Sequence, residues 1–144
     1  MSMKIEIITD LAQEPVTLEQ VKGMLRITGN GHDGALISMI VSARKYMEKA
    51  LSKSLGVKTI KVTSEDELLA DDLPYGPNQT IVTEAEINED YVYTYTAGFV
   101  EVPEDVKQGI MYLVKHWYDI DDTSALVPDA VKNIIALNTE LPML

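Results

Sequence analysis

The spacing of apolar residues along the chain predicts about four helices separated by a region of strands. Thr17 and Gln20 have the spacing of a capping box, which predicts that a short first helix starts just after Thr17 and ends before the glycine-rich run TGNGHDG. Asp33 is the expected N-cap of a longer second helix, roughly Gly34 to Lys53, because apolar residues recur there at helical spacing. These residues are Leu36, Ile37, Ile40, Val41, Met47, Ala50 and Leu51.

Between Gly56 and Thr96 the apolar period changes to roughly two, which is typical of strands. The run VKTIKVT is one predicted strand, and QTIVTEAEI and YVYTYT are two more that flank the turn-forming residues Asn88, Glu89 and Asp90 as a hairpin. The opening run KIEIIT is compatible with a short strand or an arm. Simple alternation places two sets of residues on common faces: Ile81, Thr83, Ala85 and Ile87 in one strand, and Tyr91, Tyr93 and Tyr95 in the other.

A third helix is predicted to start at Pro103, which suits the first turn of a helix. Gly109 lies within its apolar stripe and indicates close helix packing, and a fourth helix is expected from Pro128 through Leu137. The stripe of the third helix consists of Val106, Ile110, Leu113, Val114 and Trp117. We therefore expect a mainly α (α+β) fold, in which a bundle of about four helices carries a small antiparallel β-sheet or hairpin inserted between helices two and three. We expect residues 1–144 to form a single domain.

Charge and composition narrow the function classes. The 144-residue chain has 12 Lys and Arg against 23 Asp and Glu, a formal charge of −11, which argues against a protein that grips nucleic-acid phosphates. It has no cysteine, so disulfides and thiolate metal sites are excluded. The N-terminus lacks the features of a signal peptide, and the longest apolar run is too short to cross a membrane. These features predict a soluble protein made in the cytoplasm.

Residues with catalytic chemistry do not form a recognisable constellation. His32 lies in the glycine-rich loop and His116 lies beside Trp117, and neither belongs to an HExxH pair. The aspartates around residues 119–122 lack the downstream glycine and glutamate of an EF-hand, and no nucleophile elbow, Walker loop or dinucleotide motif occurs. We therefore expect no enzymatic activity, no cofactor and no metal site.

Three groups of residues are candidate interaction surfaces. Lys45 and Lys49, with Lys53 beyond them, stack positive charges along one edge of the second helix, where Arg44 and Glu48 are also expected to face solvent. This edge is either a solvated face near the helix C-terminus or a contact for an acidic neighbour. The alternating tyrosines are either sheet packing, a base-stacking platform without the usual basic groove, or a face presented to another protein, which makes Tyr91 and Tyr93 interface candidates. The apolar tail is a candidate docking peptide through Leu141, Met143 and Leu144.

Several segments, taken in order, resemble the head–tail connector (adaptor) family of tailed bacteriophages and prophages. EPVTLEQVKGMLRI is similar to the opening helix of that family, and HDGALISMIVSARKYMEKAL is similar to its long second helix. LPYGPNQTIVT resembles the entry to the family's sheet, YTYTAGFVEVPEDVKQGIMYLVKHWYD its strand-to-helix segment and VPDAVKNIIA its final helix. The chain departs from the family pattern in its acidic run SEDELLADD and in its last segment, which lacks the arginine that members often have there.

The resemblance implies a structural virion protein at the head–tail junction. Such adaptors form a closed ring of about a dozen subunits beneath the portal protein, present a platform to a stopper or tail-completion protein, and extend the channel through which DNA passes. The resemblance also implies no membrane partner. A different class of protein, an acidic regulator or DNA mimic that binds a basic host protein, is the alternative hypothesis, and a small metal-dependent enzyme that uses the aspartates is the third.

Overall fold

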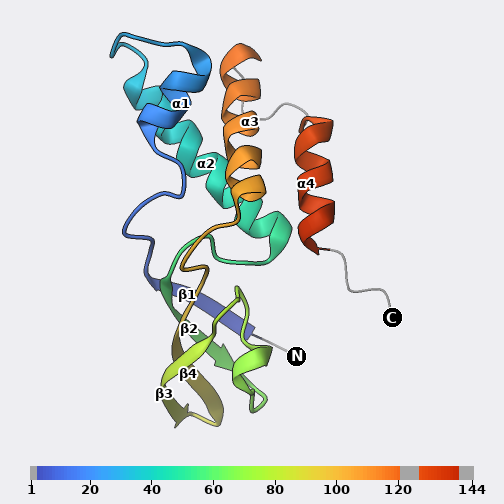
Figure 1. The fold of residues 1–144 in the computed structure, drawn as a ribbon. Helices are drawn as coiled ribbons and strands as arrows, with labels where there is room; N and C mark the ends of the chain where they lie inside the picture. Colours follow the sequence, from blue (N-terminus) through green and yellow to red (C-terminus); the bar gives the residue numbers. More distant parts are fainter. Residues whose placement is uncertain (1–2, 121–126, 140–144) are drawn as a thin grey trace. The chain divides into compact units, whose positions relative to one another are not determined.

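The computed structural model describes residues 3–120 and 127–139. The chain forms two compact units (Figure 1). The sheet unit consists of Met1–Gln13 and Ser52–Glu101, and the helical unit consists of Glu14–Leu51 and Val102–Leu144. Within the described residues, no helix is long and apolar enough to cross a membrane.

The helical unit contains α1 (Leu18–Leu25), α2 (Asp33–Leu51), α3 (Glu104–Ile120) and α4 (Asp129–Thr139). The predicted capping box at the start of α1 is confirmed. The hydroxyl of Thr17 accepts a hydrogen bond from the backbone N–H of Gln20 (3.1 Å), and the Gln20 side chain accepts one from the N–H of Thr17 (2.9 Å). Together these bonds satisfy two backbone donors that a helix start otherwise leaves without a partner.

Helix α3 packs against both α2 and α4 (Figure 1). The stripe that the sequence predicted is buried along its whole length, with Gly109 buried in the same face. A Cβ atom at Gly109 would lie 3.1 Å from Cε of Met47 on α2 and 3.6 Å from side-chain atoms of Ile134 on α4. The missing side chain therefore lets the three helices approach closely, as the sequence predicted.

The sheet unit is a four-stranded antiparallel sheet in the order β1-β2-β4-β3. Its strands are β1 (Met3–Thr9), β2 (Lys58–Ser64), β3 (Thr80–Ile87) and β4 (Asp90–Ala97). The predicted hairpin between β3 and β4 is confirmed. Its two turn residues, Asn88 and Glu89, have φ values of 53° and 71°, which matches the two-residue turns that suit the twist of a hairpin.

The expected fold class is wrong in how it places and sizes the sheet. The sheet has four strands rather than being a small insertion between helices two and three, and it begins at β1, ahead of the first helix. It also forms a compact unit with its own core. The KIEIIT run forms the strand β1 and not an arm. The sequence left both possibilities open because the pairing partner, β2, lies about fifty residues further along the chain. That both units act together as one connector-like domain stays a prediction.

A β-bulge in β3 also corrects the expected faces of the hairpin. Ile81 pairs with Tyr95 and Thr83 pairs with Thr94, so Val82 is the extra residue. The bulge puts Ile81 on the tyrosine face, whereas Thr83 and the later alternate residues lie on the opposite face. Simple alternation places Glu84 and Glu86 on the face of the sheet that does not carry Ile81. Because of the bulge, they lie on the same face as Ile81 and the tyrosines.

The acidic SEDELLADD run and the residues after it cover the tyrosine face of the sheet. The hydroxyl of Tyr93 accepts a hydrogen bond from the N–H of Leu68 (2.7 Å), and the hydroxyl of Tyr95 donates one to the carbonyl of Pro74 (2.7 Å). Burial raises the pKa of Tyr95. The core that this segment forms with the sheet consists of Ile60, Val62, Leu68, Leu73, Tyr93, Tyr95 and Ala97. The alternating tyrosines are thus mainly packing residues that anchor a covering loop.

Candidate interaction surfaces

The basic edge of α2 consists of Lys45 and Lys49. Both are exposed, lie one helical turn apart and form no ion pair with any other described residue. Helix α2 ends at Leu51 and the next residue, Ser52, has a φ of 54°, so the helical row does not continue to Lys53. Lys53 lies in the sheet unit, with its Nζ 5.9 Å from the centre of the Phe99 ring. The structure therefore brings together two of the three predicted lysines.

Arg44 and Glu48, which were expected to face solvent, are instead buried in the helical unit at 3% and 4% exposure. The Arg44 guanidinium donates to both oxygens of Glu14 (2.9 and 3.0 Å) and to Glu48 (2.9 Å). Burial by itself would lower the pKa of Arg44, but the hydrogen bonds to Glu14 and Glu48 outweigh it and raise this pKa. The i, i+4 spacing of Arg44 and Glu48 in the sequence indicates that the two side chains can form an ion pair. It does not indicate that the pair is buried, because exposed pairs on helices have the same spacing.

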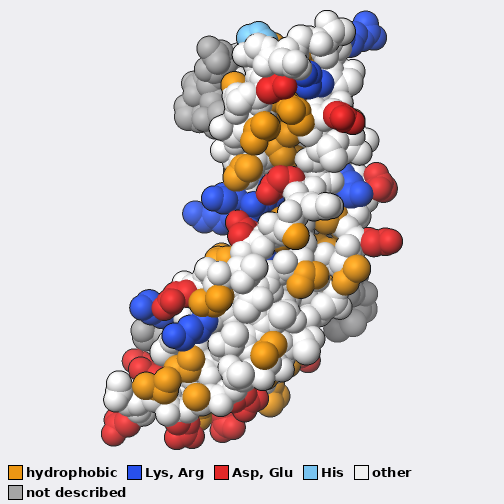
Figure 2. All heavy atoms as spheres, turned by 90° about the vertical axis from the view of Figure 1, so that its left-hand side faces the viewer, with side chains coloured by type: hydrophobic (Ala, Val, Ile, Leu, Met, Phe, Trp, Pro, Cys, Tyr) orange, Lys and Arg blue, Asp and Glu red, His pale blue; other side chains and the backbone are white. Residues whose placement is uncertain are grey.

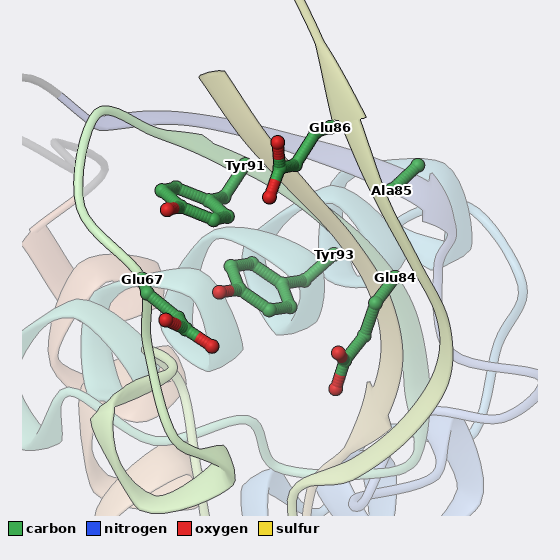
Figure 3. A pocket seen from close by; sticks show the side chains of 6 residues that line it. All are labelled: Glu67, Glu84, Ala85, Glu86, Tyr91 and Tyr93. Atoms are coloured by element: carbon green, nitrogen blue, oxygen red, sulfur yellow. The ribbon is translucent and has the colours of Figure 1, made fainter. Parts of the chain in front are cut away.

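On the sheet unit, a cavity of about 270 Å³ lies against the tyrosine face (Figure 3). The two tyrosine rings lie among the carboxylates of Glu67, Glu84 and Glu86. Tyr93 is only 2% exposed and Tyr91 is half-buried, so of the two predicted interface tyrosines only Tyr91 offers much surface to a partner. The lining residues are Glu67, Glu84, Ala85, Glu86, Tyr91 and Tyr93.

The cavity has a negative electrostatic potential. The carboxylates of Glu86 and Glu67 raise the pKa of Tyr91 because they disfavour a further negative charge on its hydroxyl. None of the three glutamates forms an ion pair with another described residue. In Figure 2, acidic side chains gather at the lower end of the molecule, where Figure 1 places the turn between β3 and β4. A cationic group would be stabilised in this cavity, and a phosphate would be repelled.

The two histidines and the acidic groups that the sequence analysis considered form no further site among the described residues. His32 makes an edge-to-face contact with the ring of Tyr118 at 5.7 Å, and His116 is partly buried on α3. Among the described residues, no group of three or more His, Cys, Asp or Glu side chains is arranged to hold a metal ion. The predicted docking residues Leu141, Met143 and Leu144 lie outside the described residues.

The chain has a two-unit α+β fold. Its candidate surfaces are charged, and its described residues form no catalytic constellation. The family model of the Phage gp6-like head-tail connector proteins matches residues 15–135. The chain therefore belongs to this family, which is named for a structural role and is not a family of enzymes. The resemblance inferred from the sequence is confirmed. No curated protein matches the chain.

Solved structures support the same fold across nearly the whole chain. A chain in the virion of a native gene transfer agent (GTA) particle superposes with a TM-score of 0.73 at 17% identity, covering 97% of each chain. A chain in the neck of an empty GTA particle, computed with C6 symmetry, gives a TM-score of 0.71 at 17% identity and covers 98% of this chain and 97% of its own. A chain in the neck of a native GTA particle, computed with C12 symmetry, gives 0.66 at 16% identity with the same coverage.

Proposed function

We propose that this chain is a structural subunit of a ring-shaped adaptor at the head–tail junction of a virion. The observation that carries the proposal is the match of the connector family model to residues 15–135. The occurrence of its structural relatives in virion necks computed with C6 and C12 symmetry supports a ring. In this role the ring joins the portal protein to a stopper or tail-completion protein and extends the DNA exit channel, and the subunit itself performs no catalysis.

The charge distribution suits such a ring. A head-to-tail ring requires two different, complementary patches on every subunit. The basic edge of α2 is one such patch, and the exposed carboxylates of the covering loop, at Glu65, Asp66, Asp71 and Asp72, are the other. The net charge of −11 also suits a channel wall that repels the DNA backbone and lets DNA pass without binding it.

The mass of the protein in solution, measured alone and mixed with purified portal protein, tests this function. We expect a ring in the mixture, because a portal provides the template on which neighbouring subunits are held together. The protein alone is expected to be smaller, since exposed charge pairs contribute little to affinity. A protein that stays a monomer or dimer with the portal, and instead binds a basic host protein, would contradict the proposal and favour the acidic-regulator hypothesis.

The double variant Lys45→Glu/Lys49→Glu tests the patches themselves. Reversing two exposed charges at each contact is expected to weaken the association of subunits by about tenfold or more per contact. Adding Glu65→Lys and Asp71→Lys should restore assembly, because the reversed patches again attract each other. The matched control, Arg26→Glu/Lys132→Glu, changes the net charge equally at exposed positions outside both patches. Equal losses in the two double variants, or no rescue, would show that these patches do not meet.

A further inference from the structure

Strand β3 is an open edge of the sheet. It is the outermost strand in the order β1-β2-β4-β3, and within the described residues it pairs only with β4. After the bulge at Val82, residues Thr83 to Ile87 continue in regular register, and all of them are exposed. The outward backbone N–H and C=O groups of this stretch therefore offer hydrogen bonds to an additional strand.

The side chains beside this edge have the period of a strand. Glu84 and Glu86 are two residues apart, share one face and lie opposite Tyr93 and Tyr91. Figure 3 shows both carboxylates next to the tyrosine rings at the cavity, with Glu67 facing them from the covering loop. A strand added to β3 would place every second side chain on this face, beside the carboxylates.

These carboxylates favour a cationic neighbour. Glu67, Glu84 and Glu86 form no ion pair within the described part of the chain. The raised pKa of Tyr91 reports the repulsion that Glu86 and Glu67 exert on further negative charge. An ammonium or guanidinium group at this place would relieve that repulsion and contact an aromatic ring.

We propose that β3 is a docking edge for an extended segment of another protein that carries Lys or Arg at alternate positions. The backbone of the segment adds to residues 83–87 as a fifth strand, and its cationic side chains lie along Glu84 and Glu86 and reach the cavity at Tyr91. The inference goes beyond the proposed function, because it requires neither a ring nor a head–tail junction.

The sequence excludes this chain as the source of the segment. None of its 12 Lys and Arg residues is two positions from another, so it contains no alternating basic pair. The outer edge of β1 in a second copy has the right direction to add antiparallel to β3. It would, however, place Met3, Ile5 and Ile7 on the tyrosine face, because these residues align there in their own sheet. The occupant that fits the charges is therefore a different protein.

A synthetic peptide of sequence TKVKTKVT tests this proposal against the full-length protein. We expect titration by NMR to show binding, with shifts and slower hydrogen exchange in the amides of residues 83–87. Two matched peptides separate the causes: TEVETEVT reverses the charge, and PKPKPKPP keeps the lysines, removes the N–H of every residue between them and favours polyproline II over a strand. Both are expected to bind at least about tenfold more weakly. Equal binding by the proline peptide would overturn strand addition.

Protein variants test the role of the carboxylates. Glu84→Gln/Glu86→Gln is expected to weaken binding of TKVKTKVT by about tenfold. Glu19→Gln/Glu101→Gln, at exposed positions, makes the same change in net charge and should leave binding unchanged. An equal loss of affinity for TKVKTKVT in both variants would show that the peptide is attracted only by the net negative charge of the protein, and this result would overturn the proposal. Concentration-dependent protection of the β3 amides without peptide would assign the edge to a second copy. The assay does not measure ring assembly, so its failure leaves the proposed connector function intact.

Discussion

Replacing Arg44 by Ala is expected to lower the free energy of unfolding by about 3–5 kcal/mol, because the change leaves carboxylates without their cation in the interior of the helical unit. Glu48 is 4% exposed and its carboxylate accepts from Arg44 at 2.9 Å. The side chain of Glu14 is 27% exposed, so water can replace part of its lost interaction. Urea unfolding followed by circular dichroism measures the change.

Two further variants separate the lost charge pairing from lost packing. Lys45→Ala, at the neighbouring exposed position, should change stability by less than about 0.5 kcal/mol. Arg44→Met/Glu48→Leu removes both buried charges and keeps apolar volume, so it should lose less stability than Arg44→Ala alone. If the double variant is as unstable as the single one, then packing rather than an unpaired carboxylate explains the loss.

The local elements of the helical unit could be predicted from the sequence because their signals are short-range. The capping box at Thr17 and Gln20 needs only a three-residue spacing, and the buried stripe of α3 repeats every turn. Gly109 could also be interpreted correctly, since a glycine within a strong helical stripe requires a reason such as close packing. None of these predictions depended on the rest of the fold.

The extent of the sheet could not be predicted because it depends on pairing between distant segments. The pairing of β1 with β2 joins residues 3–9 to residues 59–64, and no local pattern specifies such a partner. The bulge at Val82 shifts the faces of β3 by one residue, and it is visible only when the partner register is known. Arg44 was placed on the wrong side because helical spacing alone does not distinguish a buried ion pair from an exposed one.

The candidate surfaces were predicted in part. Lys45 and Lys49 are exposed as the sequence indicated, because they lie away from the buried row of Leu36, Ile40, Ala43 and Met47. The acidic cavity was missed because it combines Glu67 from a covering loop with Glu84, Glu86 and two tyrosines from a hairpin. The sequence does contain one indication of this cavity, the two glutamates at alternate positions of β3. They indicate a binding surface only when β3 is known to be an edge strand.

Gly98 is the position where a single methyl group is expected to do the most damage to the sheet unit. It follows β4, has a φ of 128°, and a Cβ atom there would overlap the carbonyl group of Gly56. Its N–H donates to the carbonyl of Pro77 (2.8 Å), its own carbonyl accepts from the Asn78 amide (3.3 Å), and the N–H of Phe99 donates to the carbonyl of Ser54 (3.1 Å). The backbone cannot move to admit a side chain without losing these bonds.

Gly98→Ala is therefore expected to destabilise the protein by about 3–5 kcal/mol, combining backbone strain of about 1–3 kcal/mol with about 0.5–1.5 kcal/mol for each hydrogen bond lost. Hydrogen exchange should become faster first in β2 and β4, the central strands on either side of this junction. Gly23→Ala is the control: apart from its chain neighbours and the backbone of α1 itself, no atom lies within 4 Å of the added Cβ, so this change should stabilise the protein by about 0.5–1 kcal/mol. A Gly98→Ala protein as stable as wild type would mean that the contact between residues 56 and 98 is looser than the structure has it, and that the end of β4 can move while the sheet stays folded.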